Sequence, residues 1–259
     1  MSAPLPSTLV LLVYGLPGAG KTTCVRSAAA VLSGRGYQTS VIELDHWLHG
    51  ALGPHADGVE AETKRTFDPD DWHSAFDHYL GGIAAALAEH AAERNNGRPR
   101  LVFCVDNHYY RSMRWRVMRA VELANDRAEG TTVGFASVLV DAHTGVCLSR
   151  NAGRDGVARV PPSVIERMDS RLERGPVKRQ PPCTDVTYDA TAKSEVPVGL
   201  AFANFIEDDY KMSLLRQRGG EARGVRWKVQ RPTNKFVHFS HHFLVAFGTV
   251  INFEVLLLK

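Results

Sequence analysis

The chain has 259 residues, 44% hydrophobic and 23% charged, which is typical of a globular protein with one sizeable core. Its formal net charge of +3 is unevenly spread: residues 212–259 carry eight Lys or Arg and two Glu, whereas the first 211 residues carry 23 Lys or Arg and 26 Asp or Glu. No apolar stretch reaches the roughly 18 residues of a membrane span, the first residues lack a basic region as signal peptides have, and the four cysteines form no CxxC pair.

These observations exclude several classes. We expect a cytoplasmic protein with no membrane partner, zinc site or disulfide framework. The basic tail fits an anionic partner, and a solvated or disordered tail explains it equally well. The oligomeric state does not follow from the sequence.

Apolar runs that read as buried strands alternate along the chain with helical patterns. The expected strands are Leu9–Tyr14, Gln38–Leu44, Leu101–Val105, Val133–Val140 and Asp185–Thr191. A helix is predicted over Lys21–Leu32, and apolar residues at steps of three and four predict another over Trp72–Leu87. A polar loop is expected before that second helix, and Asn95–Gly97 should end it. This order predicts an α/β fold of the P-loop type, with a doubly wound parallel sheet.

A glycine-rich loop follows the first predicted strand. The stretch GLPGAGKTT matches the pattern G-x-x-x-x-G-K-[ST], between a strand and a helix start, where that motif cradles phosphates with backbone N–H groups. Lys21 would reach the β- and γ-phosphates of ATP, and the Thr22 hydroxyl would bind Mg²⁺. The predicted nucleotide-binding residues are Gly15, Pro17, Gly18, Ala19, Gly20, Lys21, Thr22 and Thr23.

Two acids follow strands that should end at the same edge of the sheet as this loop. Asp106 comes after the third strand, where P-loop proteins hold Mg²⁺ directly or through water. Asp45 comes after the second strand and could orient or deprotonate an acceptor hydroxyl. The structural alternative is the same for both: an aspartate that caps the following turn.

Arginines gather in the segment from Cys147 to Met168, CLSRNAGRDGVARVPPSVIERM. Arg150 and Arg154 are placed as a closing lid would place them, to stabilise the charge on a transferring phosphoryl group. The two glycines on either side of Arg154 and the prolines that follow suit a hinge and a helix start. A solvated basic loop is the competing interpretation.

Aromatic and basic residues follow Asp106 in the stretch VDNHYYRSMRWRV. On a helix, Tyr110 and Met113 begin an apolar stripe, with Arg111 on the solvent side and Arg114 at its flank. A core helix with a charged outer face explains this pattern. Tyrosines and arginines beside a Mg²⁺ carboxylate also suit a large anionic acceptor with stacked bases and phosphates.

Two of these stretches resemble a known family. DNHYYRSMRWRV is similar to the D-N-x-Y-Y-x-S-M-R signature of the L-seryl-tRNA(Sec) kinases, and the CLSRN…R…VPPSVIERM segment resembles that family's C-L-x-R-N-x-x-R element and its P-P-x-x-I. The resemblance covers roughly residues 8–192. The family uses ATP and Mg²⁺ to phosphorylate the serine carried by selenocysteine tRNA.

The resemblance implies a catalytic role for Asp45 and places the R-N-x-x-R element at Arg150, Asn151 and Arg154. With it, we expect Lys21, Arg150 and Arg154 to act in catalysis, and Thr22 and Asp106 to bind Mg²⁺. Residues predicted to contact the substrate tRNA are Asn107, Tyr109, Tyr110, Arg111, Arg114 and Asn151. We predict a kinase domain over residues 1–192 and a helical, basic appendage over 193–259, which departs from the family from about Met212.

Two other functions stay open at this point. One is a non-catalytic, ATP-binding accessory protein of tRNA wobble-uridine modification, and the other is a P-loop kinase acting on a small molecule. The tyrosine pair and the S-M-R run favour the seryl-tRNA(Sec) kinase over both.

Overall fold

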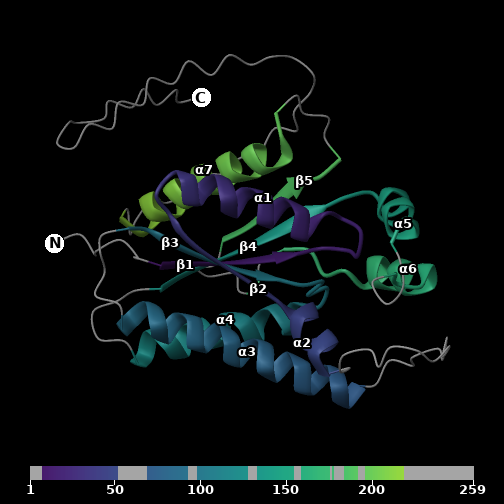
Figure 1. Cartoon of the computed structure of the whole chain (residues 1–259), viewed down its shortest axis with the longest axis horizontal. Helices are drawn as coiled ribbons and strands as arrows, with labels where there is room; N and C mark the ends of the chain where they lie inside the picture. Colours follow the sequence, from purple (N-terminus) through teal and green to yellow (C-terminus); the bar gives the residue numbers. More distant parts are fainter. Residues whose placement is uncertain are drawn as a thin grey trace, which may run out of the picture. The chain divides into compact units, whose positions relative to one another are not determined.

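Five parallel strands make up the sheet in the described residues, in the order β2-β3-β1-β4-β5 (Figure 1). The computed structural model describes residues 8–51, 69–92, 98–127, 133–154, 159–175, 177, 184–191 and 196–218. The strands are β1 Thr8–Tyr14, β2 Gln38–Glu43, β3 Arg100–Val105, β4 Val133–Asp141 and β5 Thr184–Asp189. β1 and β3 are buried along their whole length, which is why they read as unbroken apolar runs rather than as alternating ones.

Helices cover both faces of this sheet, as expected for a doubly wound fold (Figure 1). The helices are α1 Lys21–Gly34, α2 Leu44–Ala51, α3 Pro69–Ala92, α4 Arg111–Arg127, α5 Thr144–Ala152, α6 Pro162–Arg171 and α7 Val198–Arg218. α1 and α7 lie on one face, and α3 and α4 on the other. Alternate β1 residues divide between the two cores: Leu11 packs on the α1 side and Leu12 on the α3 side.

The register of the sheet brings three strand ends together. Val13 pairs with Val105 on β3 and with Val138 on β4, so β1, β3 and β4 end at one edge. The loops that follow these strands carry the glycine-rich motif, Asp106 and the start of α5. Ligands of open α/β sheets bind at this kind of edge.

Three expectations need correction. The first part of the expected polar loop forms the helix α2, while its remainder, residues 52–68, lies outside the described residues. The last strand is Thr184–Asp189 rather than Asp185–Thr191. The domain boundary after residue 192 is wrong, because α7 packs on α1 and buries Phe202 and Ile206 in the same core. The compact unit is Met1–Gly220. The departure from the family that was expected from about Met212 begins inside α7. Asn95–Gly97, which were expected to end the second helix, and residues 219–259 lie outside the described residues.

Candidate active site

The phosphate loop joins β1 to α1, as the motif predicted. Its glycines at 15, 18 and 20 have φ angles of 147°, 84° and 102°, which residues with a side chain rarely adopt. A Cβ atom on Gly15 would stand 2.4 Å from Val140 O, and one on Gly18 would stand 2.3 Å from Cys147 O. The backbone of β4 and α5 therefore closes directly on this loop and leaves no room for side chains. Pro17 and Ala19 are buried between these glycines, while Thr22 is half-buried and Thr23 exposed in the first turn of α1.

Lys21 folds back over the loop. Its Nζ donates to Gly15 O (3.0 Å), Leu16 O (2.9 Å) and Asn107 Oδ1 (2.9 Å), which uses all three of its hydrogens. Burial lowers the pKa of Lys21 to about 8, against the opposing pull of the Asp106 and Asp45 carboxylates. The ammonium group is thus held by neutral oxygens at the point where a polyphosphate would enter.

Asp45 and Asp106 both act electrostatically on Lys21, so the two predicted acids share its site. Asp106 lies in the loop after β3, where its N–H donates to Val13 O (3.3 Å). Burial raises the pKa of Asp106, and the Asn107 N–H and the Lys21 charge counter that rise. Asp45 lies exposed in the first turn of α2. The protein thus holds one sheltered and one solvent-facing carboxylate beside the same lysine.

Thr22 and Asp106 fit a Mg²⁺ ion by their chemistry, because a hydroxyl and a carboxylate are the oxygen ligands that this ion takes together with phosphate oxygens and water. In the described part of the chain, no three His, Cys, Asp or Glu residues cluster as a metal site of protein ligands alone. A magnesium ion here would be held mainly by phosphate oxygens of the nucleotide and by water, with few protein ligands, as is common for Mg²⁺.

Arg150 also reaches the phosphate loop. From α5, its Nη1 donates to Ala19 O (3.1 Å) and its Nη2 donates to Ala190 O beyond β5 (3.4 Å). Arg154, two residues past the end of α5, is exposed and contributes to the electrostatic environment of Lys21. The segment predicted as a lid therefore begins in contact with the loop that it should cover. Gly156, one of its two glycines, lies outside the described residues.

The tyrosine pair stands at the start of α4. The rings of Tyr109 and Tyr110 are 4.2 Å apart, both half-buried, and Arg171 of α6 donates to the Tyr110 hydroxyl (3.3 Å). Arg111 is exposed, although its Nη2 donates to Arg174 O (3.1 Å). Asn107, predicted as a tRNA contact, instead accepts from Lys21 and lies in the phosphate site.

Two predicted substrate contacts are wrong, since their side chains are buried and used internally. Arg114 is fully buried, and its guanidinium binds backbone oxygens of this chain. Asn151 is 1% exposed, and its amide both donates to Val160 O (2.6 Å) and accepts from Val160 N (3.0 Å). The Asn151 side chain thus forms the pair of hydrogen bonds that two strand residues form with each other, and these bonds tie α5 to the chain that enters α6. Periodicity placed Arg114 on a helix, and the resemblance singled out Asn151, but neither could show the partners that bury these side chains.

A family model described as an AAA domain matches residues 10–175. The chain belongs to this AAA domain family. The match spans the phosphate loop, both acids and the α5–α6 segment, and this AAA domain is a P-loop kinase-like protein. Such proteins generally use ATP with Mg²⁺. No curated protein sequence matches the chain.

Several solved structures are similar to this AAA domain at low sequence identity. A Chloroflexus aurantiacus protein assigned as a kinase superposes with a TM-score of 0.53 at 16% identity, over 81% of this chain and 100% of that one. APS kinase CysC of Mycobacterium tuberculosis with AMPPNP and APS has a TM-score of 0.49 at 17% identity, over 79% and 98% of the two chains. Kti12 of Chaetomium thermophilum with ADP-AlF3 has the same score and coverage at 18% identity. The likeness to the Chloroflexus aurantiacus protein shows the fold and nothing finer.

None of the helices in the described part of this AAA domain combines the length and the apolar character that a bilayer crossing needs.

Sequence reasoning missed residues around the tyrosines. Glu173, after α6, donates its N–H to Tyr109 O (2.9 Å), and its carboxylate accepts from the Arg111 N–H at the start of α4. Arg167 and Arg171 of α6 both act electrostatically on Tyr109. The four-residue spacing of these two arginines on a helix was the available signal, because it puts both on one face.

Proposed function

We propose that this protein transfers the γ-phosphoryl group of ATP, with Mg²⁺, to the seryl hydroxyl of seryl-tRNA(Sec), giving O-phosphoseryl-tRNA(Sec). The observation that carries the kinase part is the convergence on Lys21 of the phosphate loop, the two acids and the arginine segment. The tRNA part rests on the resemblance of the DNHYYRSMR and CLSRN stretches to that kinase family.

The site offers a division of labour for an in-line transfer. Lys21 would exchange its carbonyl partners for phosphate oxygens and neutralise charge on the moving group, with Arg150 and Arg154 acting from the α5 side. Thr22 and Asp106 would hold Mg²⁺, which would neutralise charge on the phosphate oxygens. Asp45, exposed and therefore accessible to an incoming acceptor, would take the seryl hydroxyl proton as the serine oxygen bonds to phosphorus and ADP leaves.

The surface beside Asp106 supports a large anionic acceptor. The half-buried rings of Tyr109 and Tyr110 lie next to the exposed side chains of Arg111, Arg167 and Arg171. Aromatic rings stack on unpaired bases, and arginines bind phosphates, as in the recognition of single-stranded tRNA ends. A kinase for a small hydroxyl compound has no need of such a surface.

A single acceptor assay tests the proposal. Purified protein is incubated with ATP and Mg²⁺ and with seryl-tRNA(Sec), seryl-tRNA(Ser) or free hydroxyl metabolites, and phosphoserine is recovered from the tRNA. We expect phosphoserine from seryl-tRNA(Sec) alone, and its loss in Lys21→Ala. Stimulation of ATP hydrolysis by tRNA without phosphoserine would point to the accessory class. Transfer to a free metabolite would point to a small-molecule kinase, and either result would overturn the proposal.

A further inference from the structure

Arg114 of the S-M-R run holds three parts of the fold together from inside the protein. It is fully buried. Its Nη1 donates to His108 O (2.9 Å), while its Nη2 donates to Glu173 O (2.7 Å) and Gly175 O (3.2 Å). Its guanidinium carbon lies 4.3 Å from the ring centre of Tyr14. One side chain thus touches the end of β1 just before the phosphate loop, the loop after β3, and the segment that follows α6.

The last two of these segments are joined by further bonds around Arg114. Glu173 donates to Tyr109 O (2.9 Å), its carboxylate accepts from the Arg111 N–H, and Arg111 donates to Arg174 O (3.1 Å). Glu173 and Arg174 are therefore bonded directly to Tyr109 and Arg111, whereas His108 and Gly175 are joined through Arg114. The segment 173–175 directly continues α6, and the Asn151 amide ties the chain entering α6 to α5.

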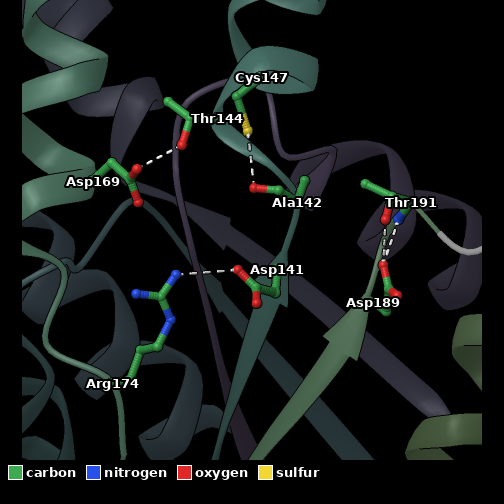
Figure 2. Close-up of polar contacts among 8 residues, drawn as sticks. All are labelled: Asp141, Ala142, Thr144, Cys147, Asp169, Arg174, Asp189 and Thr191. Carbon is green, nitrogen blue, oxygen red and sulfur yellow. Dashed lines mark hydrogen bonds and ion pairs between the residues drawn. The ribbon is translucent and has the colours of Figure 1, made fainter. Parts of the chain in front are cut away.

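A weaker contact also fixes this segment. Arg174 pairs with Asp141 at the end of β4 at 3.5 Å, but both side chains are about half exposed, and exposed ion pairs hold little (Figure 2). Thr144 of α5 donates to Asp169 of α6 (2.5 Å), and this bond, drawn in Figure 2, joins the two helices to each other. The buried Arg114 thus supplies the stronger of the side-chain anchors between segment 173–175 and the strand ends.

The chemistry at Arg114 suits an arginine specifically. A planar guanidinium donates in several fixed directions at once, whereas a lysine ammonium is a point charge on a flexible stem. One of the carbonyls it binds belongs to His108, whose φ of 38° is rare for a residue with a side chain. That turn sets the course of the chain next to Asp106 and Asn107, which both belong to the phosphate site.

We propose that Arg114 is a positioning residue that couples the α5–α6 segment to the loop carrying Asp106 and Asn107. When nucleotide orders that loop, Arg114 transmits the ordering to residues 173–175 and so to the arginine-bearing helices. The coupling depends on the phosphate site alone and not on which acceptor the enzyme uses. The arginine of the S-M-R run acts in this role from the interior, without touching the acceptor.

Hydrogen exchange of the full-length protein tests the coupling, with Mg·AMPPNP as the probe. In the wild type, the probe should slow exchange in the phosphate loop, in residues 107–111 and in residues 173–175. In Arg114→Met, the phosphate loop should still be protected, whereas the slowing at residues 173–175 should be clearly smaller, because only the direct bonds to Tyr109 and Arg111 then remain. Undiminished slowing in the variant would overturn the proposal, as would its absence from the wild type.

Two further variants guard against a trivial result. Arg119→Met removes an exposed arginine of the same helix, paired with Glu122, and should respond as the wild type does. Arg114→Lys keeps a buried cation near the same carbonyls but lacks the planar guanidinium that donates in several directions. This variant replaces Arg114→Met in the experiment if Arg114→Met does not fold. Its slowing at residues 173–175 should be smaller than in the wild type, and an undiminished response would contradict the proposal.

Discussion

Lys21 is the residue at which burial and charge compete most directly. Burial lowers its pKa to about 8, and the anionic phosphates of a bound nucleotide should raise that pKa, because they favour the charged form. Between the two pKa values the complex then holds a proton that the free protein has lost. We predict that binding of Mg·AMPPNP takes up a fraction of a proton at pH 9 and that affinity falls as the pH rises above 8. Calorimetry in buffers of different ionisation enthalpy measures this uptake.

Lys21→Arg provides the control for proton uptake. A guanidinium stays charged throughout this range, so any binding by the variant should show no uptake. An equal buffer dependence in the variant and the wild type would mean that another group takes the proton.

His108 makes a second residue-scale prediction. Burial, with smaller contributions from the Lys21 and Arg114 charges, lowers its pKa to about 3, and its Nε2 lies 3.1 Å from the Tyr79 hydroxyl. An unfolded chain binds a proton here below about pH 6.5, whereas the folded chain does not, so stability is lost as the pH falls from 6.5 towards 3. The free energy of unfolding should be measured from pH 6.5 to pH 4.5 for both proteins. For each pH unit, that of His108→Asn should fall by up to about 1.4 kcal/mol less than that of the wild type.

The matched variant for that series is His78→Asn, which changes an exposed histidine of α3. Its stability should follow the wild-type pH dependence. A His108→Asn profile parallel to the wild type would contradict the assignment of the acid loss to this residue.

At the residue scale, the sequence predicts residues whose role follows from a local motif. It misses residues whose role depends on hydrogen-bond partners distant in the sequence. Gly15, Gly18 and Lys21 are identifiable because a phosphate cradle requires them at that spacing. Arg114 and Asn151 lie in the two stretches that resemble the kinase family, but their carbonyl partners are 6 to 61 residues away along the chain. No local pattern distinguishes such an internal role from a contact with substrate.

Among the elements, α7 shows how packing extends the domain. Phe202 is fully buried between α1 and the sheet, in ring contact with Tyr188 of β5 at 4.8 Å. Deleting a large buried ring removes its burial and leaves a cavity, so Phe202→Ala should lower the free energy of unfolding by about 3–5 kcal/mol. Phe205 of the same helix is only partly buried, and Phe205→Ala should cost clearly less. Chemical denaturation compares the two, and equal costs would contradict this packing.

The elements found from sequence are those with an unmistakable period or an unbroken apolar run. β1 and β3 are predicted because burial on both faces demands apolar residues throughout. α2 was missed because it is short, beginning inside what reads as the end of a strand. The docking of α7 was missed because an apolar stripe predicts a helix but does not name the surface that it covers.

For the molecule as a whole, the compact unit extends to Gly220. A chain of residues 1–220 should therefore keep the cooperative unfolding and the Mg·AMPPNP affinity of the full protein. A chain of residues 1–191 lacks α7 and exposes the core side of α1, so it should fail to fold cooperatively. Thermal unfolding with and without nucleotide decides between them. Equal behaviour of the two truncations would show that α7 is dispensable to the domain.

The doubly wound parallel sheet could be predicted because the alternation of strands and helices admits few arrangements, whereas α2 and the docking of α7 could not. The same topology brings Lys21, Asp45 and Asp106 to one edge, although they are far apart in the sequence. What the topology does not determine is the acceptor, which depends on exposed side chains rather than on the sheet.

The rate of phosphoryl transfer by Asp45→Asn, measured beside its Mg·AMPPNP affinity, tests the shared site most directly. The acceptor used is the one that yields product in the acceptor assay. The control variant is Asp71→Asn, which changes an exposed acid in the first turn of α3. If Asp45 acts on the group held at Lys21, Asp45→Asn should lose about 10²- to 10⁴-fold in transfer rate with little change in affinity. Transfer at the wild-type rate would contradict it.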